Sequence, residues 1–184
     1  MPKIKYKLKK EKNIKEILDK PLDKNKVKFF SLFILIPLVL TMIDQFTKIL
    51  VDYYMDIGDE IKVLPGLFNI NYVINTGAAL GIFKDMTHFL VIVSSIMIVF
   101  LYFLAYHDYK NKHTVIPELI IIGGAFGNLI DRIFIDGQVR DFLEVPFFAV
   151  MNFADWFVSI GIGLLVIKYI YYYKKSDKIE EKNE

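Results

Sequence analysis

The sequence contains no cysteine. Disulfide bonds, thiolate nucleophiles and cysteine-ligated metal sites are therefore excluded. It also lacks an HExxH-type metal motif, and its three histidines, His88, His107 and His113, flank apolar segments, where we expect them to mark interfaces. We therefore expect no metal ion or other cofactor.

Long apolar runs dominate the chain. Its hydrophobic content is 54% and its mean hydropathy is +0.38, which is too apolar for an ordinary soluble domain. Four segments are long enough to cross a membrane as helices: about 29–51, 89–106, 115–133 and 152–173. These segments predict a mainly α, polytopic membrane protein. We expect one four-span domain over residues 29–173, between a lysine-rich tail (1–28) and a charged tail (174–184).

The distribution of lysine predicts the orientation of the spans. Residues 1–28 hold eleven lysines against four acids, and further lysines follow the second and fourth spans: Lys110, Lys112, Lys174, Lys175 and Lys178. The loops over about 52–88 and 134–151 hold few basic residues. By the positive-inside rule both termini are expected in the cytoplasm, with the first span an uncleaved anchor. The N-terminal tail is expected to be solvated, with attraction to anionic membrane lipids as the alternative.

Polar side chains occur at one depth in three of the four predicted spans. On this topology they all lie toward the outer side: Asp44, Lys48, Asn128, Asp131, Arg132, Asn152 and Asp155. Ionisable groups inside a membrane are costly and usually functional. The pattern therefore predicts a site near the outer rim of the membrane, with scattered charge at loop edges as the alternative.

The first outer loop is predicted to be rich in β-structure. Residues 61–83 are rich in β-branched and aromatic residues, with Pro65-Gly66 as a turn, and residues 68–75 alternate as a half-buried strand does. Two small-residue stretches, Gly77-Ala78-Ala79 and Gly123-Gly124-Ala125, admit close packing of helices. For the first stretch, a groove for an extended peptide is an alternative, whereas packing is favoured for the second.

Two aspartates suggest acid–base chemistry. Asp155 follows Asn152 by three residues, hence on the same helix face, and the helix dipole favours its charged form. Asp141 lies among apolar residues of an extended segment, and such surroundings raise the pKa of a carboxyl group. Two close carboxylates that share one proton are the apparatus of an aspartic protease.

The partner of Asp155 is either Asp141 or Asp131. Asp131 has polar neighbours in sequence, Arg132 and Asn128, which suggest a structural network between spans. The residues therefore favour Asp141 and leave Asp131 open. Asp136, beside Gly137, is typical of a turn.

Five motifs then resemble those of the lipoprotein signal peptidases, the signal peptidase II family. In order, they are "DQFTK" (44–48), "NYVINTGAALG" (71–81), "GGAFGNLIDR" (123–132), "VRDF" (139–142) and "NFAD" (152–155). The resemblance implies a bacterial membrane aspartic endopeptidase. Such an enzyme removes signal peptides from prolipoproteins and cuts before a diacylglyceryl-modified cysteine.

The resemblance also implies roles for residues at matching positions. It places the catalytic pair on Asp141 and Asp155, and it implies substrate-binding or supporting roles for Asp44, Lys48, Asn75, Gly77, Asn128, Asp131, Arg132, Asn152 and Ala154. Three positions depart from the family pattern, Leu80, Arg140 and Met151. The implied location is the cytoplasmic (inner) membrane, with the site at the extracytoplasmic face. The implied partners are prolipoproteins and membrane lipids, with no nucleic acid, and a monomer is expected.

Two other classes of function remain as alternatives. A small proton- or ion-coupled transporter also carries acids within membrane spans, but it is expected to show internal repeats and broken helices at mid-membrane. A non-enzymatic assembly factor is the third possibility. Cleavage of a lipidated precursor peptide distinguishes the enzyme from both.

Overall fold

A computed structural model describes residues 24–64, 66–77, 86–145 and 148–180. The chain divides into two compact units, residues 1–34 and 35–184. The described part of the first unit is the beginning of helix α2 (Lys24–Tyr54). Every residue of the candidate site lies in the second unit.

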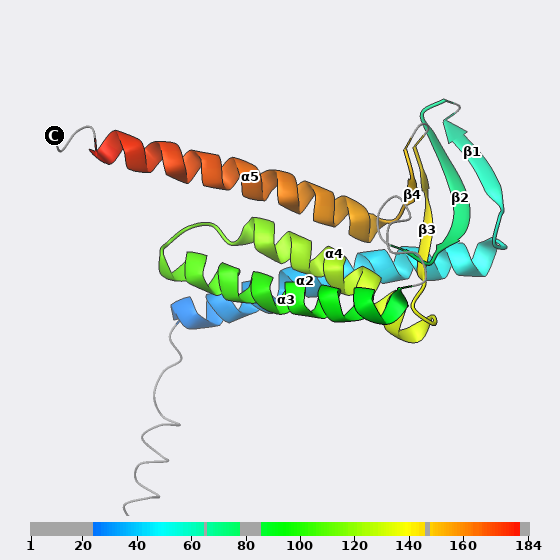
Figure 1. Ribbon diagram of the computed structural model, residues 1–184, viewed down its shortest axis with the longest axis horizontal. Coiled ribbons are helices and arrows are strands. Elements are labelled where there is room, and N and C mark those ends of the chain that lie inside the picture. Colours follow the sequence, from blue (N-terminus) through cyan, green and yellow to red (C-terminus); the bar gives the residue numbers. More distant parts are fainter. Residues whose placement is uncertain (1–23, 65, 78–85, 146–147, 181–184) are drawn as a thin grey trace, which may run out of the picture. The chain divides into compact units, whose positions relative to one another are not determined.

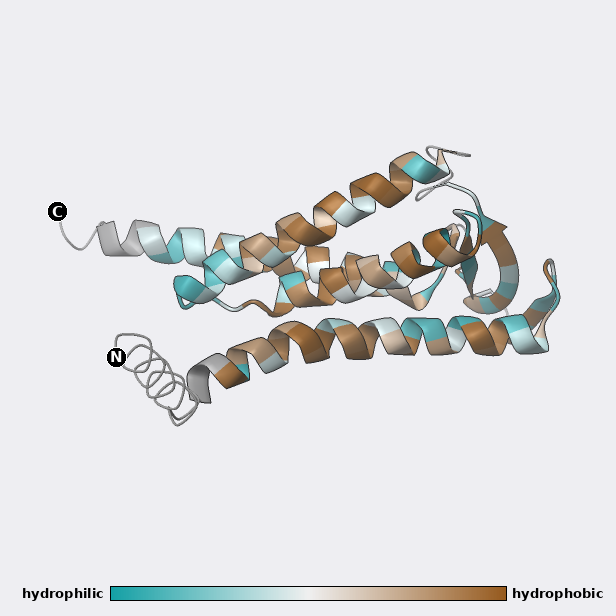
Figure 2. Ribbon diagram, turned by 90° about the horizontal axis from the view of Figure 1, so that it is seen from below, coloured by the Kyte–Doolittle hydropathy of each residue, from teal (hydrophilic) through white to brown (hydrophobic). Residues whose placement is uncertain are grey.

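Four helices occupy the positions of the four expected spans. Besides α2, they are α3 (Thr87–Lys110), α4 (Ile116–Phe134) and α5 (Phe153–Glu180). Three of them, α2, α3 and α5, are long and apolar enough to cross a membrane, and the apolar colouring along the helices is visible in Figure 2. Helix α4 has 19 residues and carries Glu118, Asp131 and Arg132, so composition alone does not mark it as a span. The mainly helical membrane fold is confirmed.

A small antiparallel sheet accompanies the helices, as the sequence predicts. Its strands are β1 (Glu60–Leu64), β2 (Phe68–Asn75), β3 (Val139–Glu144) and β4 (Val150–Met151), in the order β1-β2-β3-β4. Gly66 takes a φ of 82° in the turn between β1 and β2, a conformation that favours glycine. Residues 78–85 lie outside the described residues, and with them Leu80 and most of the predicted groove.

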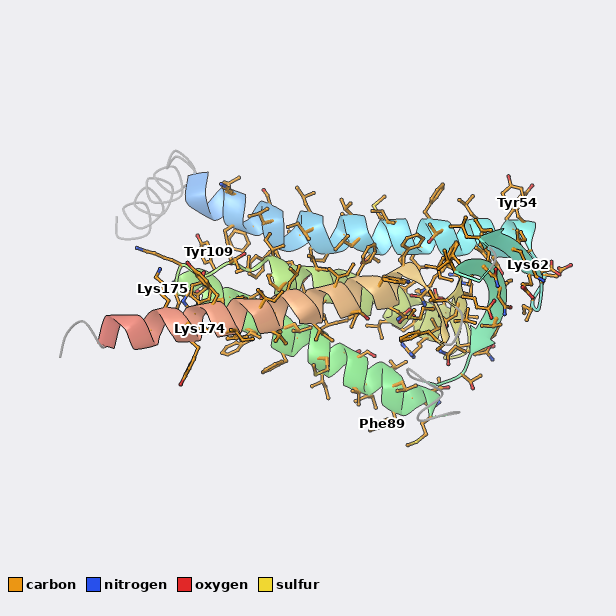
Figure 3. All side chains as sticks on the ribbon, turned by 90° about the horizontal axis from the view of Figure 1, so that it is seen from above. Tyr54, Lys62, Phe89, Tyr109, Lys174 and Lys175 are labelled. Atoms are coloured by element: carbon orange, nitrogen blue, oxygen red, sulfur yellow. The ribbon has the colours of Figure 1, made fainter. Side chains whose placement is uncertain are left out.

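The sheet lies at one end of the helices of the second unit. Helix α4 ends and α5 begins near it, while α3 starts at the same end and runs away from it (Figure 1). In Figure 3, Tyr54 and Lys62 lie at this end, and Tyr109, Lys174 and Lys175 lie at the opposite end. The described parts of the two loops predicted to face outward, and the lysine-bearing link after α3, therefore lie at opposite ends of the helices of the second unit.

Small residues of α4 allow its close packing against α2 and α5. A Cβ atom on Gly123 would lie 2.8 Å from Cβ of Leu40 in α2, and one on Gly124 would lie 2.9 Å from Cγ2 of Val158 in α5. Thr41 of α2 also donates a hydrogen bond to the carbonyl of Gly123 over 2.9 Å. The packing role predicted for this stretch is thus confirmed.

A buried ionic cluster joins α3, α4 and α5. The ammonium of Lys168 contacts the carboxylates of both Asp108 and Glu118, and all three residues are at most 5% exposed. His113, which stacks on the ring of Tyr172, lies 3.6 Å from Asp108. Isolated charges would be costly here, so the cluster couples the three helices through charge pairing.

Candidate active site

Asn152 organises the beginning of α5. Its side-chain oxygen accepts a hydrogen bond from the backbone N–H of Asp155 over 3.0 Å, and its own backbone N–H donates to Oδ2 of Asp155 over 3.1 Å. These reciprocal bonds form a capping box, in which the side chains at the N-cap and third helical positions satisfy free backbone N–H groups. The cap also fixes the Asp155 carboxylate at the helix N-terminus.

Asp141 comes to the same place from strand β3. Its carboxylate accepts hydrogen bonds from Nδ2 of Asn152 over 2.6 Å and from Nδ2 of Asn75 over 2.9 Å. Asn75 is the last residue of β2, which pairs with β3. The sheet therefore brings Asp141 and one of its donors together, while α5 supplies the other donor.

The environment of Asp141 favours its protonated form. Only 1% of the residue is exposed. Burial, followed by the negative charge of Asp155, raises its pKa to about 7, although the hydrogen bonds from Asn75 and Asn152 act in the opposite direction. The structure thus places two interacting carboxylates together, one of them able to hold a proton near neutral pH.

Asn128 of α4 connects this pair to α2. It donates from Nδ2 to Oδ1 of Asp155 over 2.7 Å. Its side-chain oxygen accepts from Asn152 over 2.9 Å and from the ammonium of Lys48 over 3.0 Å. Each polar atom of the Asn128 amide group is therefore engaged in fixing the pair or its supports.

Lys48 is fully buried and paired with two acids. Its ammonium lies 2.8 Å from Asp44 and 3.3 Å from Asp131. Asp44 in turn accepts the backbone N–H of Ala154, in the first turn of α5, over 2.8 Å. Lys48 and Asp44 thus hold α2 against the beginning of α5 and belong to the supports of the site.

Asp131 has further partners besides Lys48. Its carboxylate accepts from Gln45 over 2.9 Å and from the guanidinium of Arg140 over 2.8 Å. The sequence predicted a structural network at Asp131 between the first and third spans, and the contact with Gln45 of α2 confirms it, but Arg132 and Asn128 were the expected polar partners. The observed partners come instead from α2 and β3, because these elements pack on the face of α4 that carries Asp131.

A pocket of about 650 Å³ opens beside the two carboxylates. Its lining includes Asn75, Gly77, Asn128, Arg132, Asp141 and Asp155, together with apolar residues of β2, β3, β4 and α5. Arg132 donates to the carbonyl of Gly77 over 3.1 Å, and its buried Nε has no hydrogen-bond partner among the described residues. The pocket thus combines apolar walls with two acids, amides and a cation, as ligand sites commonly do.

Every residue predicted for the site takes part in this arrangement or its supports. Asp136 stands apart from it: it is exposed in a turn with a φ of 45°, as predicted. Sequence reasoning missed Gln45 and treated Arg140 only as a departure from a pattern. Both bond to Asp131, and the position of Gln45 beside Asp44 was the available signal for it. Among the described residues, no group of three His, Cys, Asp or Glu side chains is placed to hold a metal ion.

Taken together, the fold and the pocket define an integral membrane protein with paired carboxylates at one end of a helical bundle. A family model described as signal peptidase II matches residues 36–171. The chain belongs to this family.

Individual relatives agree. The lipoprotein signal peptidase of Fusobacterium nucleatum subsp. nucleatum is 33% identical over 78% of this chain and 89% of its own length. The lipoprotein signal peptidase of Symbiobacterium thermophilum is 37% identical, and the match covers 74% of this chain and 92% of that protein. Two solved structures of a bacterial membrane enzyme have TM-scores of 0.70 and 0.66. The first is 32% identical, and the match covers 76% of this chain and 87% of that structure's chain. The second is 33% identical, and the match covers 73% of this chain and 90% of that structure's chain.

Proposed function

We propose that this protein is an aspartic endopeptidase that removes signal peptides from prolipoproteins, with Asp141 and Asp155 as its catalytic pair. Membership of the signal peptidase II family supports the substrate class. The aspartic chemistry is supported above all by one observation: Asn152 hydrogen-bonds both carboxylates beside one pocket. The acids of the pocket lie at one end of the helices and not at their middle, which does not favour the alternative of a transporter.

The pair performs hydrolysis by sharing one proton. The ionised carboxylate takes a proton from a water molecule as that water attacks the scissile carbonyl carbon. The protonated carboxyl donates to the carbonyl oxygen, and a proton then passes to the leaving amine as the C–N bond breaks. A pKa of about 7 for Asp141 suits this role, because this carboxyl then still binds a proton as the pH approaches neutrality.

Neighbouring groups position the substrate and the acids. Asn75, Asn128 and Asn152 hold the carboxylates, while Asp44, Lys48, Asp131 and Ala154 hold the elements that carry them. Arg132 and Gly77 line the pocket and present polar groups to an extended peptide. The apolar walls of the pocket accommodate the apolar part of a lipid-modified substrate.

The protein is expected in the bacterial cytoplasmic (inner) membrane, with both termini in the cytoplasm and the pocket at the extracytoplasmic face. The positive-inside rule supports this orientation, since Lys174 and Lys175, together with Tyr109 next to the lysine-bearing link after α3, lie at the end away from the sheet. Reporters fused after residue 184 and near Asn111 should read cytoplasmic, and one near Gly58 should read external. An external C-terminus would contradict the orientation.

Cleavage of a defined precursor tests the proposed function. The purified protein in lipid is incubated with a precursor peptide that carries a diacylglyceryl-cysteine, and with the same peptide carrying unmodified cysteine. We expect one cut, immediately before the cysteine, in the lipidated peptide, and much slower cleavage of the other; mass spectrometry identifies the products. Absence of cleavage of both peptides by folded protein would refute the proposal.

A further inference from the structure

Arg140 immediately precedes Asp141 in strand β3, but the side chains of the two residues contact different partners. Neighbouring residues of a strand point to opposite faces. The guanidinium of Arg140 lies among α2 and α4, where only 8% of the residue is exposed. It donates to Asp131 from Nη2 over 2.8 Å and from Nε over 3.3 Å, and to the side-chain oxygen of Gln45 over 3.3 Å. Such a two-point contact uses the planar fork of arginine, which lysine does not reproduce.

The backbone of Arg140 is held as firmly as its side chain. Its N–H donates to Oδ2 of Asp131 over 3.0 Å. Its carbonyl accepts from Nδ2 of Asn152 over 3.3 Å, the same amide group that bonds Asp141. The residue next to Asp141 is thus fixed on one side by α4 and on the other by the cap of α5.

The pairing of β2 with β3 explains why such a fixing point is needed. Val73 pairs with Asp141 and Ile70 pairs with Leu143, so two residues of β2 face the single residue Phe142 of β3. An irregularity of this kind interrupts the ladder of hydrogen bonds and bends the strand. Since it lies beside Asp141, the ladder alone holds this carboxylate less firmly than a regular one would.

Arg140 also balances the buried charge behind the site. Four buried groups meet there, the acids Asp44 and Asp131 and the cations Lys48 and Arg140. The exposed carboxylate of Asp52 also lies 3.8 Å from the guanidinium of Arg140. The formal charges of the four buried groups sum to zero, and without Arg140 these groups carry one uncompensated negative charge. Lys48, which also donates a hydrogen bond to Asn128, is then, among the described residues, the one buried cation beside the two buried carboxylates of Asp44 and Asp131.

We propose that Arg140 is a positioning residue for the catalytic pair, acting through Asp131 to fix the backbone of β3 at Asp141. This inference rests on the proposed function, because it concerns the placement of the same carboxylate. It predicts loss of turnover with little loss of substrate binding, because Arg140 lies outside the residues that line the pocket. A displacement of a reacting group by about 1 Å can cost on the order of 100-fold in rate.

A double-mutant cycle tests the proposal. Turnover of the lipidated precursor peptide is measured per folded molecule for Arg140→Gln, Asp131→Asn and the double variant. The matched control is Lys62→Gln, which removes one positive charge from an exposed position of β1. We expect kcat to fall about 10-fold in each single variant with KM within about twofold, and the double variant to be no worse than about 10-fold, because the two residues act as one unit. The control should match the wild type.

Several outcomes would overturn the inference. One is a kcat for Arg140→Gln within about twofold of the wild type, whatever its melting temperature. Another is a double variant whose loss equals the product of the two single losses. If Arg140→Gln does not fold, Arg140→Lys decides. A fall in its kcat supports the proposal because lysine lacks the fork, and an unchanged kcat refutes it.

The same experiment separates this inference from the proposed function. If the wild type does not cleave the peptide, or if Asp141→Asn cleaves it as fast as the wild type, the proposed function fails. If the wild type cleaves, Asp141→Asn does not, and Arg140→Gln is unimpaired, only the role of Arg140 fails.

Discussion

The side-chain amide of Asn152 donates a 2.6 Å hydrogen bond to the carboxylate of Asp141, while the backbone N–H of the same residue donates to Asp155. A single residue therefore caps a helix and joins two acids that come from different elements. Because the cap fixes the position of Asn152, it also fixes the distance at which the two carboxylates meet.

Replacement of Asn152 separates these two roles. Asn152→Ser keeps an oxygen that can cap α5 but loses the amide that bonds Asp141, whereas Asn152→Ala loses both. We expect both variants to lose about 10-fold or more in turnover, since the carboxylates are no longer joined. Only Asn152→Ala should also lose about 1 kcal/mol of stability, the usual value of an N-cap. Melting curves and turnover per folded molecule check these expectations. Turnover of Asn152→Ser equal to that of the wild type would contradict the claim that the Asn152 amide positions Asp141 beside Asp155.

The pH dependence of turnover follows from Asp141. Its pKa is raised to about 7, so the pair holds a shared proton below that pH and loses it above. The rate should therefore fall as pH rises through about 7. The measurement is kcat/KM for the lipidated peptide between pH 5.5 and pH 9, a range chosen to span the pKa of about 7. A rate that is constant or rising across this range would count against a shared proton.

The stability of the protein should also depend on this carboxyl. A folded-state pKa above the usual value means that the folded protein binds more protons than the unfolded chain between about pH 4 and about pH 7. The contribution of Asp141 to stability is thus present at low pH and is lost as pH rises through about 7. In Asp141→Asn, the decline of the melting temperature from pH 5 to pH 8 should be smaller than in the wild type. An equal decline in both proteins would contradict the assignment.

Gly127 tests how closely α4 approaches the supports of the site. A Cβ atom there would lie 2.9 Å from Cγ of Asp44 and 3.0 Å from Cβ of Ala154. Gly127→Ala should therefore lower the melting temperature and the turnover by pushing α2 and α5 away from α4. The control is Gly163→Ala in α5, where an added Cβ meets nothing within 4 Å and helix propensity improves by about 1 kcal/mol. Equal effects of the two substitutions would show that close packing at Gly127 is not the cause.

The sequence predicted the parts of this protein that depend on local pattern. Apolar runs predicted the helices, and the alternation over residues 68–75 predicted a strand, which is observed as β2. The depth at which Asp44, Asn128 and Asn152 occur predicted that they would meet. Each of these features can be recognised from residues that are close in sequence or from the position of a residue along a predicted span.

Features that depend on packing between distant elements were not predictable in this way. Asp131 was assigned its helical neighbours as partners, because spacing along one helix is what a sequence displays. Its observed partners, Gln45 and Arg140, depend on which face of α4 meets α2 and β3. The same holds for Lys168, which lies inside the predicted apolar span 152–173: its partners Asp108 and Glu118 are on two other helices, so its neighbours in sequence do not indicate the ion pairs.

The central claim is that Asp141 and Asp155 form the catalytic pair, and one measurement tests it most directly. It is turnover of a diacylglyceryl-modified precursor peptide per folded molecule for Asp141→Asn, Asp155→Asn, the double variant, Asp131→Asn and Asp136→Asn. The account predicts that the first three variants fold, bind the peptide and have lost about 100-fold or more of the activity, without additive losses in the double variant. Asp131→Asn should keep measurable turnover, and Asp136→Asn should match the wild type. Substantial activity in Asp141→Asn together with none in Asp131→Asn would contradict the account and transfer the pair to Asp131 and Asp155.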